Sequence, residues 1–79
     1  MITAAQCRAA RGLLDWTQAE LARRLSMSVV TVRAFEKGGE MRASNLKLLK
    51  LIFEEAGVIF IHANEAGDGV RWAKPQPSE

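Results

Sequence analysis

A gap of three residues between two short helical segments is the feature that most constrains how this chain folds. Residues 18–25 carry apolar side chains at spacings of three and four, and residues 29–37 follow after only "SMS". Ser28 is suited to cap the second segment, and Gly38 and Gly39 are suited to end it, because glycine adopts the left-handed conformation at little cost. A tight turn must therefore join two short helices.

Two helix starts of the same kind are predicted nearer the N-terminus. Thr3 with Gln6, and Thr17 with Glu20, fit the capping box, in which the hydroxyl and the side chain three residues later each bind the other residue's backbone amide. The first pair predicts a helix over residues 4–14. The helical spacing predicts these buried side chains: Cys7, Ala10, Leu14, Leu21, Ala22, Leu25, Val32 and Phe35. On the same register, the side chains left largely outside are Val29, Val30, Arg33 and Lys37.

A fourth helix and a β-hairpin complete the predicted elements. Ser44 is expected to cap the helix and Gly57 to end it, and its apolar residues cover an arc on the order of 200°, too wide for one small core. After Gly57 the helical spacing of apolar residues stops, and "VIFIHA" and "VRWA" are predicted to form two strands joined by a turn over residues 64–69. An isolated hairpin is hardly stable in water, so the strands must dock on the fourth helix, pair with a second chain, or both.

These elements predict a mainly α architecture. Residues 1–57 form the helical domain, residues 58–73 form the hairpin, which we interpret as a dimerisation element, and residues 74–79 are expected to be a disordered polar tail. A chain of 79 residues buries only about 60% of its unfolded surface, which also favours a partner subunit. The residues assigned to dimerisation are Leu51, Ile52, Val58, Ile59, Phe60 and Ile61.

The composition excludes several kinds of chemistry. Cys7 is the only cysteine and His62 the only histidine, so an internal disulfide and a cluster of metal ligands are not expected. We interpret Cys7 as a small buried apolar group. No nucleophile, base and orienting group can be assembled in order along the sequence, so neither an enzyme nor a cofactor is predicted.

The net charge of +2 hides an asymmetry along the chain. The first fifty residues hold nine basic and four acidic residues, whereas the rest hold two basic and five acidic ones. The first part is therefore suited to face a polyanion. No apolar run approaches the roughly 18 residues of a membrane span and no basic leader precedes one, so we expect a cytoplasmic protein with no membrane partner.

The two short helices and their turn have the length and spacing of a helix-turn-helix, whose second helix enters the major groove of DNA. The segment "WTQAELARRLSMSVVTVRAFEKG" resembles the Xre family of transcriptional regulators, which includes phage repressor and Cro proteins, and the similarity extends over residues 7–49. The stretch "EEAGVIFIHANEAGDGVRW" resembles a small bacterial subgroup with a C-terminal β-hairpin. The resemblance implies a four-helix, lambda-repressor-like fold followed by the hairpin.

The resemblance also implies a role for individual residues in binding double-stranded DNA. The residues expected to contact bases are Ser28, Val29, Val30 and Arg33. Those expected to contact phosphates are Thr17, Gln18, Lys37 and Arg42. Arg11 and Glu36 match a buried ion pair that ties the first helix to the third, a structural role.

The sequence departs from the family pattern at a few positions. Ser26 stands where glycine is usual, and Glu40 puts an anion in a loop that faces phosphate in the family. Val29 and Val30 replace polar residues at the start of the reading helix.

Two functions therefore stay open at this stage. The first is a sequence-specific regulator that binds an inverted repeat as a homodimer, with the valines against thymine methyl groups. The second is a helix-turn-helix that captures another regulatory protein, as an antiactivator or antitoxin does, with the valines as apolar anchors.

Overall fold

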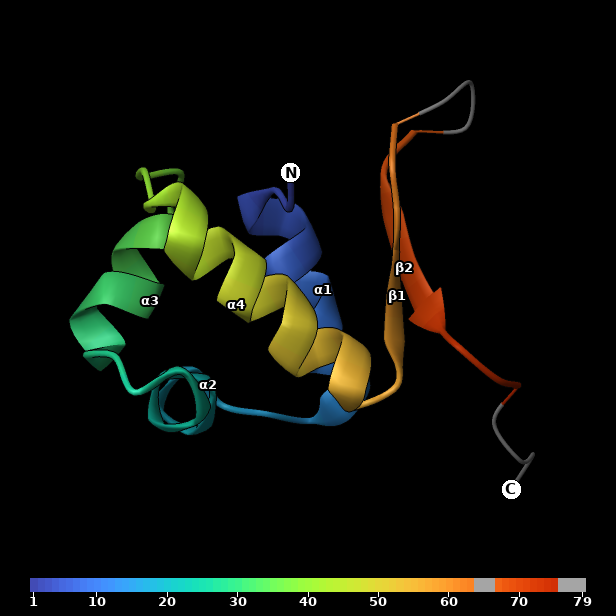
Figure 1. Cartoon of the computed structure of the whole chain (residues 1–79), viewed down its shortest axis with the longest axis horizontal. Coiled ribbons are helices and arrows are strands. Elements are labelled where there is room, and N and C mark those ends of the chain that lie inside the picture. Colours follow the sequence, from blue (N-terminus) through green and yellow to red (C-terminus); the bar gives the residue numbers. More distant parts are fainter. Residues whose placement is uncertain (64–66, 76–79) are drawn as a thin grey trace.

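Four helices are followed by an antiparallel two-stranded hairpin in the computed structural model, which describes residues 1–63 and 67–75 (Figure 1). The predicted fold class, mainly α with a C-terminal hairpin, is confirmed. Part of the predicted turn, residues 64–66, and most of the predicted tail, residues 76–79, lie outside the described residues. The elements are α1 (Ala4–Leu14), α2 (Gln18–Leu25), α3 (Val29–Glu36), α4 (Ala43–Glu55), β1 (Val58–Ile61) and β2 (Gly69–Trp72).

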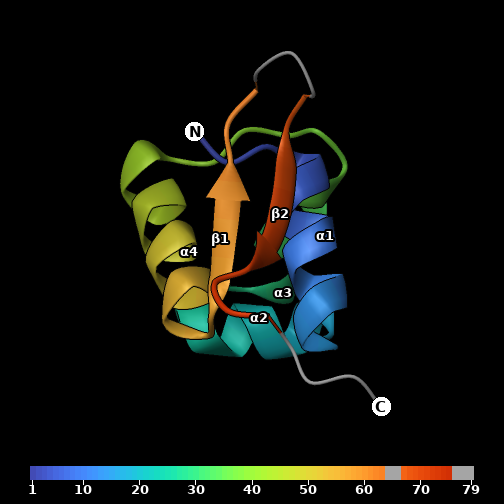
Figure 2. The same cartoon turned by 90° about the vertical axis from the view of Figure 1, so that its right-hand side faces the viewer.

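The hairpin and α3 lie on opposite sides of the molecule. Figure 1 shows α3 at one end of the long axis and the two strands at the other, with α1 and α4 between them. Figure 2, turned by 90°, shows the strands lying across α1 and α4, with α2 and α3 behind. A surface on α3 and a surface on the outer side of the hairpin are therefore separate.

The helix starts follow the predicted signals in part. At α1 the complete capping box forms between Thr3 and Gln6. At α4 the prediction is wrong by two residues, because the helix begins at Ala43 and Ser44 lies inside its first turn. The Arg42 carbonyl already accepts from the Leu46 amide at 2.9 Å, so the helical hydrogen bonds begin before Ser44.

The end of α3 depends on two glycines. The helix ends at Glu36, one residue earlier than predicted, and Gly38 follows with φ +102°. At Gly39 a Cβ atom would lie 2.8 Å from the Ala34 carbonyl oxygen, so a larger residue would displace the loop from the helix. Gly38 supplies the left-handed turn, and Gly39 allows the close approach.

The core sits between the helices and the inner face of the hairpin. All the predicted interior side chains of α1, α2 and α3 are buried except Leu14, which packs against the core from its edge. Phe53 of α4 is fully buried and stacks on Trp16, with ring centroids 5.6 Å apart. It also meets Phe60 of β1 edge to face at 5.8 Å. The hairpin is therefore part of the core packing.

The strand register determines which side chains of the hairpin point inward. Val58 pairs with Trp72, and Phe60 pairs with Val70. Directly opposed residues lie on one face of an antiparallel pair, and Val58 and Phe60 are buried, so this face packs on the helices. Ile59 and Ile61 lie on the other face and are half-buried.

One side chain of α1 fastens the hairpin. Gln6 Nε2 donates to the Ile61 carbonyl at 3.0 Å and to the Gly69 carbonyl at 3.1 Å, while its Oε1 accepts from the Thr3 amide at 3.0 Å. Gln6 is 5% exposed, so these bonds are shielded from water. The same amide group therefore caps α1 and holds the last residue pair of the sheet.

We expect Gln6→Ala to lower the free energy of unfolding by about 1–3 kcal/mol, because it leaves two partly buried carbonyl groups without their donor. Hydrogen exchange at the amides of β1 and β2 should accelerate more than exchange in α2. Thr3→Ala is the matched control, since it removes only the capping bond. Equal effects of the two variants on the hairpin would show that Gln6 does not fasten it.

Candidate nucleic-acid interface

The turn between α2 and α3 forms as the sequence predicts. Ser26 takes the left-handed conformation, with φ 55°, and its amide donates to the Ala22 and Arg23 carbonyls. Ser28 then caps α3, because its Oγ accepts from the Val30 amide at 3.1 Å. Ser26 adopts a conformation that glycine reaches more easily, which costs some stability without changing the turn.

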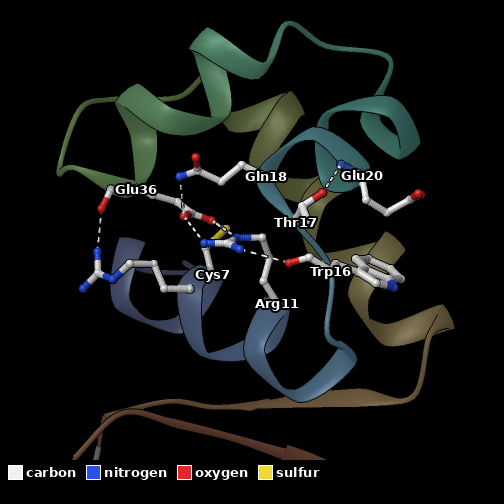
Figure 3. Close-up of polar contacts among 8 residues, drawn as sticks. Cys7, Arg11, Trp16, Thr17, Gln18, Glu20 and Glu36 are labelled. Atoms are coloured by element: carbon white, nitrogen blue, oxygen red, sulfur yellow. Dashed lines mark hydrogen bonds and ion pairs between the residues drawn. The ribbon is translucent and has the colours of Figure 1, made fainter.

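A buried carboxylate at the end of α3, away from this turn, joins three helices (Figure 3). The Glu36 side chain, at the end of α3, is 2% exposed. Arg11 of α1 donates to it twice, from Nε to Oε2 at 2.7 Å and from Nη2 to Oε1 at 2.7 Å. Arg11 also donates from Nη1 to the Trp16 carbonyl at 3.0 Å. The guanidinium thus holds α3 against α1 and against the segment that leads into α2.

Three further side chains complete this group, and we call Cys7, Arg8, Arg11, Gln18 and Glu36 the Glu36 clamp. Gln18 Nε2 donates to Glu36 Oε1 at 3.0 Å, and Cys7 Sγ donates to Oε2 at 3.1 Å. Arg8 Nη1 donates to the backbone carbonyl of Glu36. Within the described residues, every buried side-chain nitrogen and oxygen has a hydrogen-bond partner. The clamp therefore also ties the first residue of α2 to the end of α3.

The environment of the clamp keeps its acid ionised. Burial works to raise the pKa of Glu36, but the hydrogen bonds from Arg11, Gln18 and Cys7 and the charge of Arg11 outweigh it, so this pKa lies below its ordinary value. The hydrogen bond to Glu36 raises the pKa of Arg11. Burial, together with the neighbouring carboxylate, raises the pKa of the Cys7 thiol, which therefore stays protonated and donates.

The outward face of α3 is narrower than predicted. Val30 is 63% exposed, and Thr31, Arg33 and Lys37 are also exposed. Val29 was expected to lie outside as well, but it is half-buried and packs against the core. Successive helical residues are about 100° apart, so the two valines fall on either side of the boundary between core and solvent. Val30 is a large apolar side chain that this helix leaves in solvent.

The residues predicted to contact phosphate lie at three helix ends. Thr17 and Gln18 begin α2, where Thr17 Oγ1 accepts from the Glu20 amide at 3.0 Å. Gln18 uses one hydrogen of its amide group on Glu36, and the second hydrogen is left for another acceptor. Lys37 follows α3 and Arg42 precedes α4, and both are exposed. Figure 3 shows the start of α2 beside the Glu36 end of α3.

The Glu20 carboxylate, predicted to reach back to Thr17, instead pairs with two arginines of its own helix. It meets Arg23 and, at 2.9 Å, Nε of Arg24. The hydrogen bond from Arg23 is the largest cause that holds the pKa of Glu20 below its ordinary value. Arg24 also lies 4.0 Å above the ring of Trp16. The cation–π contact explains why Arg24 leans toward the loop before α2, which the sequence pattern did not indicate.

The six residues assigned to dimerisation do not share one surface. Val58 and Phe60 are 0% and 8% exposed, because the hairpin register turns them into the chain's own core. Ile52 is half-buried against the same core. Leu51 is 50% exposed, and Leu48, which belongs to the predicted apolar arc but not to the residues assigned to dimerisation, is 36% exposed. The surplus apolar surface predicted for the fourth helix is therefore present as Leu48 and Leu51.

Residues 1–63 and 67–75 contain no group of three or more His, Cys, Asp or Glu side chains that could hold a metal ion. No helix in this part of the chain is long and apolar enough to cross a membrane.

A known helix-turn-helix family matches most of the chain. The model of a family described as helix-turn-helix, HTH_3, matches residues 8–58, which run from the first half of α1 to the first residue of β1. No curated protein matches the chain. The similarity of residues 54–72 to a hairpin-bearing subgroup lies mostly beyond the matched range and stays a prediction.

The ion pair of Arg11 with Glu36 should contribute to the stability of the fold. We expect Arg11→Met and Glu36→Leu each to lower the free energy of unfolding by about 3–5 kcal/mol, because each leaves a buried or partly buried charge without its partner. The double variant should be more stable than either single one, since it leaves no unpaired charge. Urea unfolding at pH 7 measures this, with Glu20→Gln as a surface control that changes little. A double variant no better than the worse single one would contradict the prediction.

The same pair predicts an acid limit to stability. The folded pKa of Glu36 lies below the ordinary value of about 4.3, so its contribution is complete above that pH and is lost as the pH falls through the folded pKa. The double variant should therefore lose less stability than the parent chain between neutral and acid pH. Parallel acid dependences in the two proteins would mean that other carboxylates set the limit.

Proposed function

The chain belongs to the HTH_3 helix-turn-helix family, a family of DNA-binding regulators that are generally not enzymes, and we propose that it binds a specific inverted repeat in double-stranded DNA as a homodimer. The observation that carries the proposal is the outward face of α3, on which Val30 and Arg33 are exposed while the Glu36 clamp holds the C-terminal end of the helix against α1 and α2. A helix held in this way projects from the domain in one orientation, as entry into a major groove requires.

Base recognition in this proposal centres on Val30 and Arg33. The Val30 side chain is suited to contact a thymine methyl group, and the Arg33 guanidinium is suited to bind O6 and N7 of guanine together. Ser28 can still donate from its hydroxyl, because its bond to the Val30 amide uses the oxygen only as an acceptor. Of the four residues assigned to base contacts, Val29 contributes least, since it is half-buried.

Phosphate contacts would fix the position of α3 in the groove. The first turn of α2 has free backbone amides and the positive end of the helix dipole, and Thr17 and Gln18 stand at that turn. Lys37 and Arg42 border the loop after α3 and need no special geometry to meet a phosphate. Glu40 is exposed in the same loop and would oppose such contacts there.

Dimerisation would use the apolar surface that the monomer leaves uncovered. Leu48 and Leu51 on α4 and Ile59 and Ile61 on the outer face of the hairpin are the side chains that support this. A two-fold dimer on an inverted repeat places its two reading helices about 34 Å apart, one turn of DNA. Val58 and Phe60 would support the interface from behind, as core residues.

If the chain binds DNA through phosphate contacts, its affinity for DNA should fall as the salt concentration rises. Lys37→Ala and Arg42→Ala should each weaken binding and reduce the slope of log K against log salt by about one. Lys47→Ala is the matched control, because Lys47 lies on the side of α4 that faces β1. Electrophoretic shifts with fragments flanking the chain's own gene, over a salt series, measure both. Equal effects of Lys47→Ala and Arg42→Ala would contradict the proposed orientation.

Substitution of Val30 distinguishes DNA binding from protein capture, the two functions that the sequence left open. The family match favours DNA binding. Val30→Asp should abolish specific DNA binding, whereas Arg33→Ala should relax the preference at one base pair at a cost of about 1–3 kcal/mol. If no fragment binds better than random DNA, and a protein partner is instead lost with Val30→Asp at any salt concentration, the protein-capture function is the correct one.

If the chain dimerises, its mass in solution should rise with protein concentration. Sedimentation at micromolar concentration should give twice the 8.7 kDa monomer mass. Leu51→Asp or Ile59→Asp should shift the equilibrium to monomer. Lys50→Asp is the matched control and should shift it less, because Lys50 lies beside Leu51 in sequence but on the side of α4 that faces β1. A monomer at every concentration would remove the dimer from the proposal and leave the DNA contacts untouched.

A further inference from the structure

A cavity formed by the described residues is lined by no residue of α3. It has a volume of about 310 Å³ and lies between the N-terminal segment, the start of α1, the first half of α4 and the end of β1. Sites for small ligands in proteins have volumes of about 300–1,000 Å³. Ile2, Leu46 and Phe60 give it apolar walls. The cavity is therefore large enough for a small molecule and is separate from the proposed DNA-reading face.

The ionisable side chains around this cavity carry nitrogen donors, and none of its lining residues is acidic. Lys47 and Lys50 stand three residues apart on α4 and so share one side of the helix, and His62 follows β1. In the described part of the chain, Lys47 and His62 make no side-chain hydrogen bond or ion pair. Lys50 has only a long contact of 3.9 Å with Glu54. These three side chains lack a strong anionic partner and border an apolar space.

The remaining polar wall is already satisfied. Gln6 lines the cavity, but its Oε1 accepts from Thr3 and its Nε2 donates to the Ile61 and Gly69 carbonyls. A ligand would therefore meet an apolar interior with lysine ammonium groups and an imidazole at its edge. That arrangement favours a molecule that has an apolar body and one anionic end.

We propose that this cavity binds a small organic anion with an apolar body, of the class of medium-chain or aromatic carboxylates. The body lies against Ile2, Leu46 and Phe60, and the carboxylate takes charge-assisted hydrogen bonds from Lys47 and Lys50. His62 adds a donor from the strand side. Because the walls come from both α4 and β1, the ligand braces the hairpin against the helical part of the chain. Binding of this kind does not require DNA.

Octanoate and 1-octanol are suitable probes, because they share an apolar chain and differ in charge. Titration of the intact ¹⁵N-labelled chain should shift the amides around Leu46, Lys47 and His62 with octanoate, and 1-octanol should bind more weakly at the same place. The double variant Lys47→Gln with Lys50→Gln should bind octanoate about tenfold more weakly, the size of one charge-assisted hydrogen bond, and bind octanol unchanged.

Two controls keep the result specific. Lys37→Gln removes a cation that does not line the cavity and should leave octanoate binding unchanged, while Ala43→Leu places a larger side chain at the cavity edge and should weaken both probes. Lys37, Ala43 and Lys47 are exposed and have no side-chain partner in the described structure, and the contact of Lys50 with Glu54 is long. These variants should therefore fold. Equal affinity for octanoate and octanol, shifts scattered over the whole surface, or octanoate binding unaffected by the double lysine variant would overturn the proposal.

Discussion

Glu36 accepts hydrogen bonds from Arg11, Gln18 and Cys7, and this buried charge fixes the position of α3. A carboxylate in the interior is costly unless donors surround it, so the helix is stable only where all these donors reach it. The donors come from α1 and from the start of α2. The outward direction of Val30 and Arg33 is thus set by contacts at the C-terminal end of the same helix.

Much of the fold could be predicted because short-range signals mark the ends of its helices. The capping box at Thr3 and the glycine after α3 depend on neighbouring residues alone. The start of α4 was misplaced because Ser44 is a good cap by residue type, whereas the helical hydrogen bonds begin at Arg42. The inward face of the hairpin could not be chosen from "VIFI", since every residue is apolar and both faces look alike.

The candidate site was harder to predict, because its contacts join residues far apart in the sequence. Family resemblance pointed to Arg11 with Glu36, but Cys7 was interpreted as an apolar group and nothing marked Arg8. Both donate to Glu36, across 29 and 28 residues. Gln18 was assigned to phosphate alone, while its amide also serves the clamp. Periodicity placed both valines outside, and only the packed structure separates the half-buried Val29 from the exposed Val30.

The hydrogen bonds from Gln6 to the hairpin connect positions that are 55 and 63 residues apart in a short chain. Contacts of such long sequence separation slow folding, because closing the intervening loop costs chain entropy before the contact repays it. A ribosome that has made only the four helices has not yet supplied Val58 and Phe60, two residues of the core. The nascent chain therefore reaches its final packing only after the second strand has emerged, and until then its apolar interior stays open to other binding partners in the cell.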